Sequence, residues 1–386
     1  MFVYTSLLFF VLFCLRGLRY NADSVVDGTE LLMSFLVHRH GERTPVQSSL
    51  TLSNHVDELR KASAKYGFGQ LTNLGKRRSY QLGQFIRRRY DKLLSPTFNR
   101  SEIYVRSTDF IRAKMTVLTA LAAVYPATAD NWSTDINWTP VPYTTVPAKY
   151  DFNLAIINCP KFKESFFRSK ITSTVPELDL YADTLAHWSH IVGNNISSQP
   201  LIIPYALYDL YACQISLGVP LEDEIAEIYP EIEQIAAIAI KAMFYTDSMR
   251  ALSAGVLLNE FFTVADKVIA GVDVQKVHIY SAHDVNVFAL EAATKVANPQ
   301  GVPKYASAYA LELRKVVDTG EYVVVPVYLN TPKEEVITYL EIEDCGQLCA
   351  YDSFRSTTSR YNLKESEWRA ECGFSDDLDV DSFAID

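Results

Sequence analysis

Three times along the chain, a short apolar run ends in basic or histidine residues before a turn or a helical pattern. The runs are "LLMSFLV" at 31–37, "EIYVR" at 102–106 and "VHIYSA" at 277–282. Each has the length and composition of a strand, and the segments after the second and third carry apolar residues at helical spacing. This alternation predicts an α/β fold with a largely parallel central sheet flanked by helices.

Charged side chains gather where each predicted strand ends. In parallel α/β sheets, ligands bind beyond the carboxyl ends of the strands, where helix N-termini also point free amide groups. If the three strands are neighbours in the sheet, their terminal residues meet at one place. The residues that converge there are Arg39, His40, Arg43, Arg106, His283 and Asp284.

The region from about 150 to 270 is rich in helical patterns, such as "ELDLYADTLAHWSHIVGNN" at 177–195. We interpret it as an inserted, smaller helical subdomain that caps the sheet. The chain then returns to β structure, with "DTGE" at 318–321 as a hairpin turn. The predicted organisation is a signal peptide (1–22), a first part of the α/β core (23–150), a helical cap (151–271), a second part of the core (272–375) and an acidic tail (376–386).

The N-terminus carries an apolar stretch from Leu7 to Leu15, which is too short to span a bilayer and has the size of a signal-peptide core. Secretion is therefore expected, with no transmembrane anchor once the signal is removed. Arg16 and Arg19 follow the stretch and no basic residue precedes it, so an uncleaved anchor is the alternative. Four glycosylation sequons fit secretion, at Asn99, Asn131, Asn137 and Asn195.

Composition narrows the classes of ligand. The 386 residues are 48% hydrophobic, enough for a full core, and carry a formal net charge of −10. No broad basic field exists to hold a polyanion, which argues against a nucleic-acid partner. An anionic ligand must therefore be held by a local cluster of cations.

Five cysteines remain after the signal, so at least one thiol is left without an intrachain partner. Cys345 and Cys349 lie four residues apart and could close a small loop in an oxidising compartment. A zinc site is the alternative, but no matching Cys or His pair lies nearby. His38 and His40 share one face of a strand, yet no further ligand pattern accompanies them, and we expect no metal.

The clustered residue types suit phosphoryl transfer. Arginine side chains match phosphate oxygens two at a time and stabilise the charge of a transferring phosphoryl group. A histidine among cations has a depressed pKa and keeps a lone pair for nucleophilic attack. An adjacent acid then protonates the leaving alcohol, and Asp284 is the natural candidate.

The same residues carry a family resemblance. "RHGERTP" at 39–45 resembles the RHGxRxP signature of the histidine acid phosphatases, the branch of the histidine phosphatase superfamily that includes prostatic and lysosomal acid phosphatases and phytases. "YVRSTDFIRAKMTVLTALAAVYP" at 104–126 is similar to that family's second arginine motif, and "SAHD" at 281–284 to its His-Asp motif. "QLTNLGKRRSYQLGQFIRRRY" at 70–90 is also similar, so the resemblance covers most of the chain.

The resemblance implies a role for each matched residue. His40 would form a phosphohistidine, Asp284 would act as the general acid, and no metal or organic cofactor would be needed. The phosphoryl oxygens would be bound by Arg39, Arg43, Arg106 and His283. An acidic optimum follows if Asp284 must be protonated for the first step.

The resemblance also has implications for the cysteines and for dimer formation. The resemblance implies disulfides Cys159–Cys372 and Cys345–Cys349 and leaves Cys213 free, because Ala308 stands near the place of its partner. Trp138 resembles a dimer-contact position, which implies a homodimer, although Thr144 departs from the histidine found nearby in relatives.

We therefore expect a secreted, or alternatively lysosomal, acid phosphatase that hydrolyses phosphate monoesters. Val285 and Asn286 replace the two threonines usual in animal relatives, and Asn286 is similar to the HDxN of phytases, so a phytase or lysophosphatidate phosphatase is the runner-up. A secreted relative that binds phosphate esters or proteins without catalysis is the alternative from another class. Turnover of monoesters at acidic pH distinguishes it from an enzyme.

Overall fold

The computed structural model describes residues 25–128, 132–168 and 175–374. The predicted signal peptide, the acidic tail and the sequon at Asn131 lie outside these residues. The asparagines of the other three sequons, Asn99, Asn137 and Asn195, are exposed.

One mixed sheet forms the centre of the described chain, with the strand order β3-β2-β4-β1-β5-β6-β7 and β8 paired to β6. β3, β2, β4 and β1 are mutually parallel, and the strands from β5 onward are antiparallel. The predicted largely parallel central strands are confirmed, as is the 318–321 hairpin that joins β5 and β6. The strands are β1 Thr29–Arg39, β2 Ile103–Ser107, β3 Thr144–Thr145, β4 Val277–Ala282, β5 Ala308–Val316, β6 Tyr322–Thr331, β7 Val336–Tyr339 and β8 Cys349–Ala350.

Helices cover both faces of the sheet. α3 (Asn73–Arg89) and α4 (Ile111–Val124) pack on one face through residues such as Leu82 and Val117. α9 (Asp247–Ile269) and α10 (Asp284–Ala293) pack on the other, where Phe35 of β1 meets Phe261. These layers bury the alternating side chains of the central strands on both sides, so the apolar runs of the sequence have little polar interruption.

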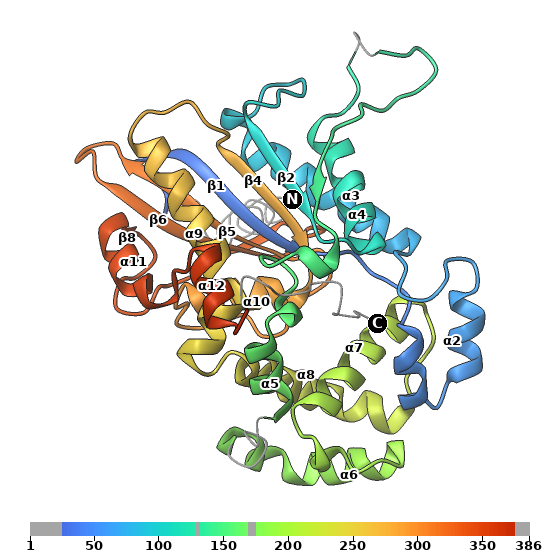
Figure 1. Cartoon of the computed structure of the whole chain (residues 1–386). Coiled ribbons are helices and arrows are strands. Elements are labelled where there is room, and N and C mark those ends of the chain that lie inside the picture. The colour runs from blue at the N-terminus through green and yellow to red at the C-terminus, as the bar shows by residue number, and fades with distance from the viewer. Residues whose placement is uncertain (1–24, 129–131, 169–174, 375–386) are drawn as a thin grey trace, which may run out of the picture.

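A group of helices lies below the carboxyl ends of the central strands in Figure 1. It consists of α5 (Pro160–Arg168), α6 (Ala182–Val192), α7 (Ile202–Ser216) and α8 (Asp223–Met243). α9 follows them in sequence but packs against β1 and α10 in the sheet layer. The boundaries of the predicted subdomain stay a prediction, while its helical content is observed.

The remaining helices are short. They are α2 (Val56–Ser63), α11 (Tyr351–Thr358) and α12 (Glu365–Glu371), and short 3-10 helices occur at Gln47–Leu52, Asp91–Leu93, Ala148–Tyr150, Ile156–Asn158, Pro176–Tyr181, Ile196–Ser198 and Ser359–Tyr361.

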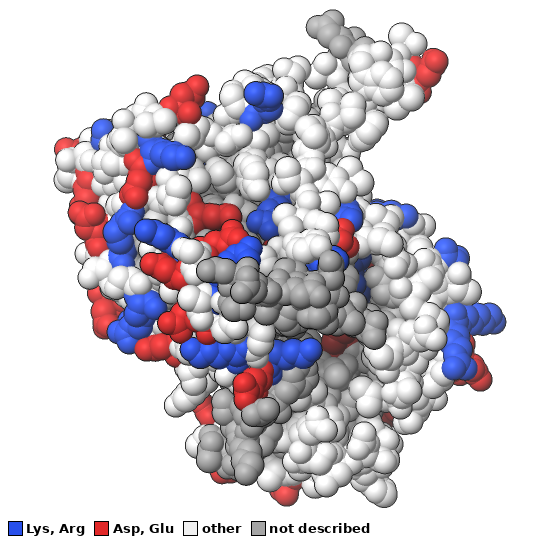
Figure 2. Space-filling model, in the orientation of Figure 1, with Lys and Arg blue, Asp and Glu red and all other residues white. Residues whose placement is uncertain are grey.

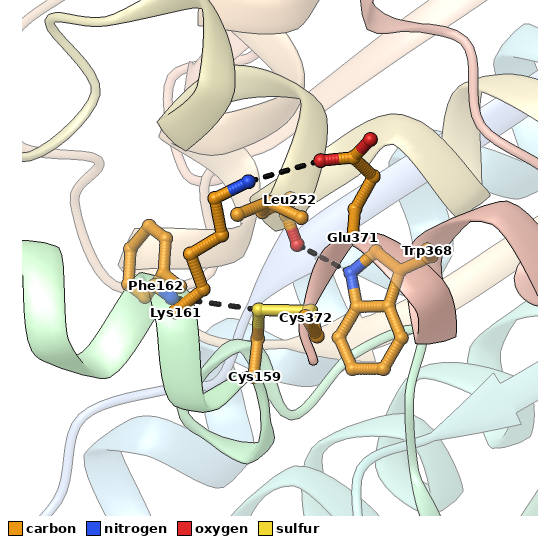
Figure 3. The surroundings of a disulfide bond; sticks show 7 residues. All are labelled: Cys159, Lys161, Phe162, Leu252, Trp368, Glu371 and Cys372. Carbon is orange, nitrogen blue, oxygen red and sulfur yellow. Dashed lines mark hydrogen bonds and ion pairs between the residues drawn. A yellow bond between two sulfur atoms is a disulfide. The ribbon is translucent and has the colours of Figure 1, made fainter. Parts of the chain in front are cut away.

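Two disulfides form as expected, Cys159–Cys372 and Cys345–Cys349. Figure 3 shows the first, which joins the start of α5 to the end of α12, 213 residues later. Trp368 packs beside it and donates from Nε1 to the Leu252 carbonyl (2.7 Å). The C-terminal helix is thereby tied both to α5 and to α9.

The surface carries mixed charge and one projecting loop. Over α11 and the neighbouring strands, Figure 2 shows basic and acidic side chains interspersed. The loop between α4 and β3 projects from the body (Figure 1) and exposes Trp132, Ile136 and Trp138. Within the described ranges, no helix has both the length and the apolar character needed to cross a membrane.

Candidate active site

The turn that follows β1 is held by a close approach of two backbones. A Cβ atom at Gly41 would lie 2.5 Å from the carbonyl oxygen of Gly75 in the first turn of α3, so only glycine fits there. The Gly41 amide also donates to Thr116 Oγ1 of α4 (3.1 Å). The "RHGE" turn is therefore fixed from both sides and presents its neighbouring side chains in one orientation.

Parallel pairing brings two predicted motifs together. β1 and β4 are in register with Arg39 opposite Ala282, so the residues that follow each strand lie side by side. The ring centroids of His40 and His283 are 5.4 Å apart. The prediction that these strand ends converge is confirmed for β1 and β4.

His40 is held in the form that a nucleophile requires. Its Nδ1 atom lies 2.8 Å from the Gly41 carbonyl oxygen, which can only accept, so Nδ1 carries the proton and Nε2 keeps the lone pair. Burial lowers the pKa of His40 well below its ordinary value, and nearby Arg112, His283, Arg39 and Arg43 lower it further. Burial and these neighbours therefore favour the neutral imidazole.

A cavity of about 250 Å³ opens beside His40. Four of the predicted site residues line it, together with Arg112, two further carboxylates and an apolar wall. The lining residues are His40, Arg43, Thr108, Asp109, Phe110, Arg112, Ala148, Asp151, Leu154, Ala155, Ile156, Ile157, His283, Asp284, Val285 and Asn286. The cavity combines a cationic end with an apolar side.

Arg39 lies behind this cavity and contacts the predicted acid. Its Nη2 atom is 2.8 Å from Asp284 Oδ2, and its guanidinium carbon is 4.2 Å from the ring centroid of Tyr305. Asp284 is the first residue of α10, and its Oδ1 accepts from the Val285 amide (2.9 Å). Arg39 thus adds positive charge next to the acid.

Arg106 does not occupy the place that the sequence predicted. On β2, Ile103 and Val105 face α3 and α4, so Arg106 points to the opposite face of the sheet, where its Nη2 donates to Asp151 (2.6 Å). It lines a neighbouring cavity that also contains Glu260. Arg106 is therefore close to two carboxylates, Asp151 and Glu260, and it lies outside the cavity of His40.

Arg112, which the sequence reasoning missed, lies inside it. It is in the first turn of α4, and its Nη2 lies 3.5 Å from His283 Nδ1. In the described part of the chain it forms no ion pair within 4.0 Å, and burial and then Arg43 lower its pKa to about 10. A basic residue at a helix N-terminus opposes the helix dipole, and this is the signal that could have marked it as an anion ligand.

Asn286 connects the acid-bearing helix to the apolar wall. Its Oδ1 accepts from the His283 amide (3.2 Å), and its Nδ2 donates to the Leu154 carbonyl (2.7 Å). The His283 ring in turn lies 3.2 Å from Thr108 Oγ1. The departure from threonine at 286 therefore fixes the cavity wall relative to α10.

His38 and Cys213 are both fully buried beside the site. Burial lowers the pKa of His38 to about 4, and its Nδ1 contacts the Arg39 carbonyl (3.1 Å). Cys213 is a free thiol, as expected, and contacts Arg43 Nη1 and the Tyr305 hydroxyl, each at 3.2 Å.

Sequence comparison identifies the family. A family model described as "Histidine phosphatase superfamily (branch 2)" matches residues 30–330, and the chain belongs to this superfamily. Bovine prostatic acid phosphatase is 31% identical over 363 residues, covering 91% of this chain and 90% of the relative. Human lysosomal acid phosphatase is 28% identical over 346 residues, covering 87% and 79%.

Solved structures of the same fold include the phytase from Citrobacter braakii, with a TM-score of 0.65 at 12% identity, covering 90% of this chain and all of that one. Hafnia alvei phytase in complex with tartrate has a TM-score of 0.62 at 13% identity, with coverages of 90% and 100%. The predicted family and fold are confirmed. The predicted enzyme class, phosphoric monoester hydrolase, is the class of the named acid phosphatases.

Proposed function

We propose that this protein hydrolyses phosphate monoesters through a covalent phosphohistidine on His40. The observation that carries the proposal is the state of this residue: a neutral, buried imidazole with its Nε2 lone pair free, at the cationic end of a cavity. Such a group attacks a phosphorus centre without first losing a proton to a base.

The reaction has two steps. In the first, His40 Nε2 bonds to phosphorus, the ester P–O bond breaks, and Asp284 gives its proton to the leaving oxygen. In the second, Asp284 takes a proton from a water molecule that attacks phosphorus, and the P–N bond breaks. The products are the alcohol and inorganic phosphate, with His40 and Asp284 returned to their starting forms.

The cations stabilise the charge on the transferring group. Arg43 and Arg112 line the cavity, and Arg39 supports them from behind. His283 lines it too, but burial and the arginines lower the pKa of His283 well below its ordinary value, so it would bind a phosphoryl oxygen as a neutral group. Arg112 has no carboxylate of its own among the described residues, so an incoming phosphoryl group would supply the missing counter-charge. We assign the third arginine of the phosphate site to Arg112 rather than to Arg106.

The leaving group would lie against the apolar wall formed by Phe110, Leu154, Ile156 and Ile157. The rest of the lining includes Asp109 and Asp151 and no lysine. These features favour a monoester with an aryl or alkyl group, such as a lysophosphatidate, over phytate, whose further phosphates need additional cations.

The test compares wild type with His40→Ala on an aryl phosphate, lysophosphatidate and phytate at pH 5. Wild type is expected to turn over the first two and to trap an acid-labile phosphoenzyme, and the variant to lose activity by about 10³-fold or more. Retained activity in His40→Ala would refute the mechanism. A wild type that binds vanadate but turns over no monoester would instead support the non-catalytic binding alternative.

Secretion, with the lysosome as the alternative, and homodimer formation also remain part of this proposal. The exposed sequons at Asn99, Asn137 and Asn195 support a secretory route. The exposed Trp138 on the projecting loop supports a dimer contact. Glycan analysis and sedimentation of the mature chain test the two points separately.

A further inference from the structure

Asp209, a residue of α7 in the helical part of the chain, reaches two arginines of the "RHGER" turn. Its Oδ1 accepts from Arg39 Nη2 (3.2 Å) and its Oδ2 from Arg43 Nη2 (2.6 Å). The two arginines precede it by 170 and 166 residues. One carboxylate therefore bridges two cations that would otherwise repel each other at the site.

The same face of α7 supplies a second contact. Cys213 lies one helical turn after Asp209, and its sulfur atom accepts from Arg43 Nη1 (3.2 Å). Asp209 and Cys213 thus hold the two terminal nitrogens of a single guanidinium group. The plane of the Arg43 guanidinium group is therefore fixed by contacts from α7.

Arg39 is fixed in a comparable way. Its Nη1 donates to the Pro303 carbonyl (2.7 Å), and its Nη2 is shared between Asp209 and Asp284. Tyr305 stacks on its guanidinium carbon at 4.2 Å. Asp209 is therefore the group that links Arg39 to Arg43, while the other contacts hold each arginine separately.

We propose that Asp209 is a positioning residue, which sets the orientation of Arg39 and Arg43 for the transferring phosphoryl group. This inference rests on the proposed function. Burial opposes the charged form of Arg43, but Asp209, Cys213 and Tyr305 together outweigh it and raise the pKa of Arg43, so the arginine stays charged although it is buried. The helical part of the chain is thereby a component of the active site and not only its cover.

Orientation and ground-state binding respond differently to loss of this carboxylate. Misaligned donors stabilise the transition state less, which lowers kcat. Removal of a negative charge near the phosphate does not weaken substrate attraction, so KM changes little. A split between kcat and KM is therefore the signature of positioning.

The test measures kcat and KM for an aryl phosphate, with inhibition by orthovanadate, in Asp209→Asn and Asp209→Glu. We expect Asp209→Asn to lower kcat by about 10- to 100-fold with KM within about 3-fold, and Asp209→Glu to recover part of the loss. The matched control is Asp266→Asn on α9, where the carboxylate accepts from Tyr351 (2.7 Å) and pairs with Arg355 away from the cavity. Its kcat and KM should equal those of wild type.

A kcat within 2-fold of wild type in folded Asp209→Asn, or a rise in KM alone, would overturn the inference. If that variant does not fold, Cys213→Ala and Cys213→Ser replace it. A lower kcat in Cys213→Ala, with Cys213→Ser near wild type, supports positioning from α7. A kcat equal to that of wild type in both variants rejects it. If wild type turns over no monoester, the proposed function fails separately. Calorimetry of vanadate binding to wild type and Asp209→Asn then decides the positioning role, with weaker binding expected in the variant and equal binding rejecting it.

Discussion

Two groups of largely buried arginines lie along β1, one at its middle and one beyond its end. The structural group contains Arg89 and Arg314 around Glu312, which lies opposite Ser34 in the middle of the strand. The active-site group lies beyond its end and contains Arg39, Arg43 and Arg112. Both hold one more arginine than carboxylate, counting Asp209 and Asp284 in the second, so net charge does not separate them.

The pairing of the guanidinium nitrogens does separate them. In the structural group, Arg89 Nε donates to one oxygen of Glu312 (2.6 Å) and Arg314 Nε to the other (2.9 Å). Burial opposes the charge of Glu312, but Arg89 and then Arg314 outweigh it and lower its pKa. This carboxylate is fully buried and every strong contact is internal, which is the arrangement of a structural ion cluster.

In the active-site group, the Nε atoms of Arg39, Arg43 and Arg112 are buried without a hydrogen-bond partner in the part of the chain that the structure describes. A cavity adjoins two of these side chains. Unpaired cationic donors next to an open space are costly for the empty protein and become favourable when an anion binds. The unpaired Nε atoms beside the cavity of His40 therefore distinguish this group from the group around Glu312, although the Nε atom of Arg106 is also unpaired among the described residues.

Removal of the central carboxylate tests the structural group. We expect Glu312→Gln to lower the free energy of unfolding by about 3–5 kcal/mol, because two buried arginines lose their counter-charge. Denaturant unfolding measures the loss, and kcat of the folded variant should stay within about 2-fold of wild type. Glu371→Gln, whose partner Lys161 is half exposed, serves as the control and should cost less than about 1 kcal/mol.

Arg112→Met tests the active-site group. We expect kcat/KM to fall by about 10²- to 10³-fold with no loss of unfolding free energy, because no carboxylate is left unpaired. Arg106→Met should show the opposite pattern. Its free energy of unfolding should fall because Asp151 loses its partner, and its kcat/KM should fall less than that of Arg112→Met. The assignment of the phosphate arginine is wrong if Arg106→Met loses more activity than Arg112→Met in folded protein.

His38 is buried on β1, and its substitution tests how much a buried histidine changes the free energy of unfolding. Its pKa is about 4 in the folded protein and near 6.5 when unfolded, so only the unfolded chain gains a proton as the pH falls between these values. The contribution of this histidine to stability is therefore lost from pH 6.5 down to 4, by up to about 3 kcal/mol. Unfolding of His38→Phe across this range should show a shallower pH dependence. An unchanged slope would contradict it, and the exposed His187 provides the control position.

The smallest expected effect concerns the pH–rate profile. Because burial and the neighbouring groups lower the pKa of His40 well below its ordinary value, protonation of this histidine should limit the rate only at lower pH than for an ordinary histidine. We expect kcat/KM for an aryl phosphate to drop by less than about 2-fold between pH 6.5 and 5 through this group. An acid limb with an apparent pKa near 6.5 would show that His40 titrates as an ordinary histidine. A flat profile from pH 4 to 8 would contradict the role of a protonated Asp284.

Much of the site was predictable because its parts are local in the sequence. A strand followed at once by His40 or His283 places that side chain at a known edge of a parallel sheet. Arg106 and Arg112 could not be separated in this way, since both belong to one short motif. Their difference depends on the alternation of side chains along β2 and on which face α9 covers.

The sequence by itself determined the α/β alternation, the strand-end histidines, the acid at the start of α10 and the short disulfide loop, because each depends on residues close together in the chain. Only the tertiary structure decided that Arg112 faces the cavity and that Asp209 joins Arg39 to Arg43. The first depends on how α4 packs against the sheet, and the second on how α7, about 170 residues after β1, packs against the strand ends. Local hydrophobic periodicity does not encode that docking, which is set by the fit of whole elements.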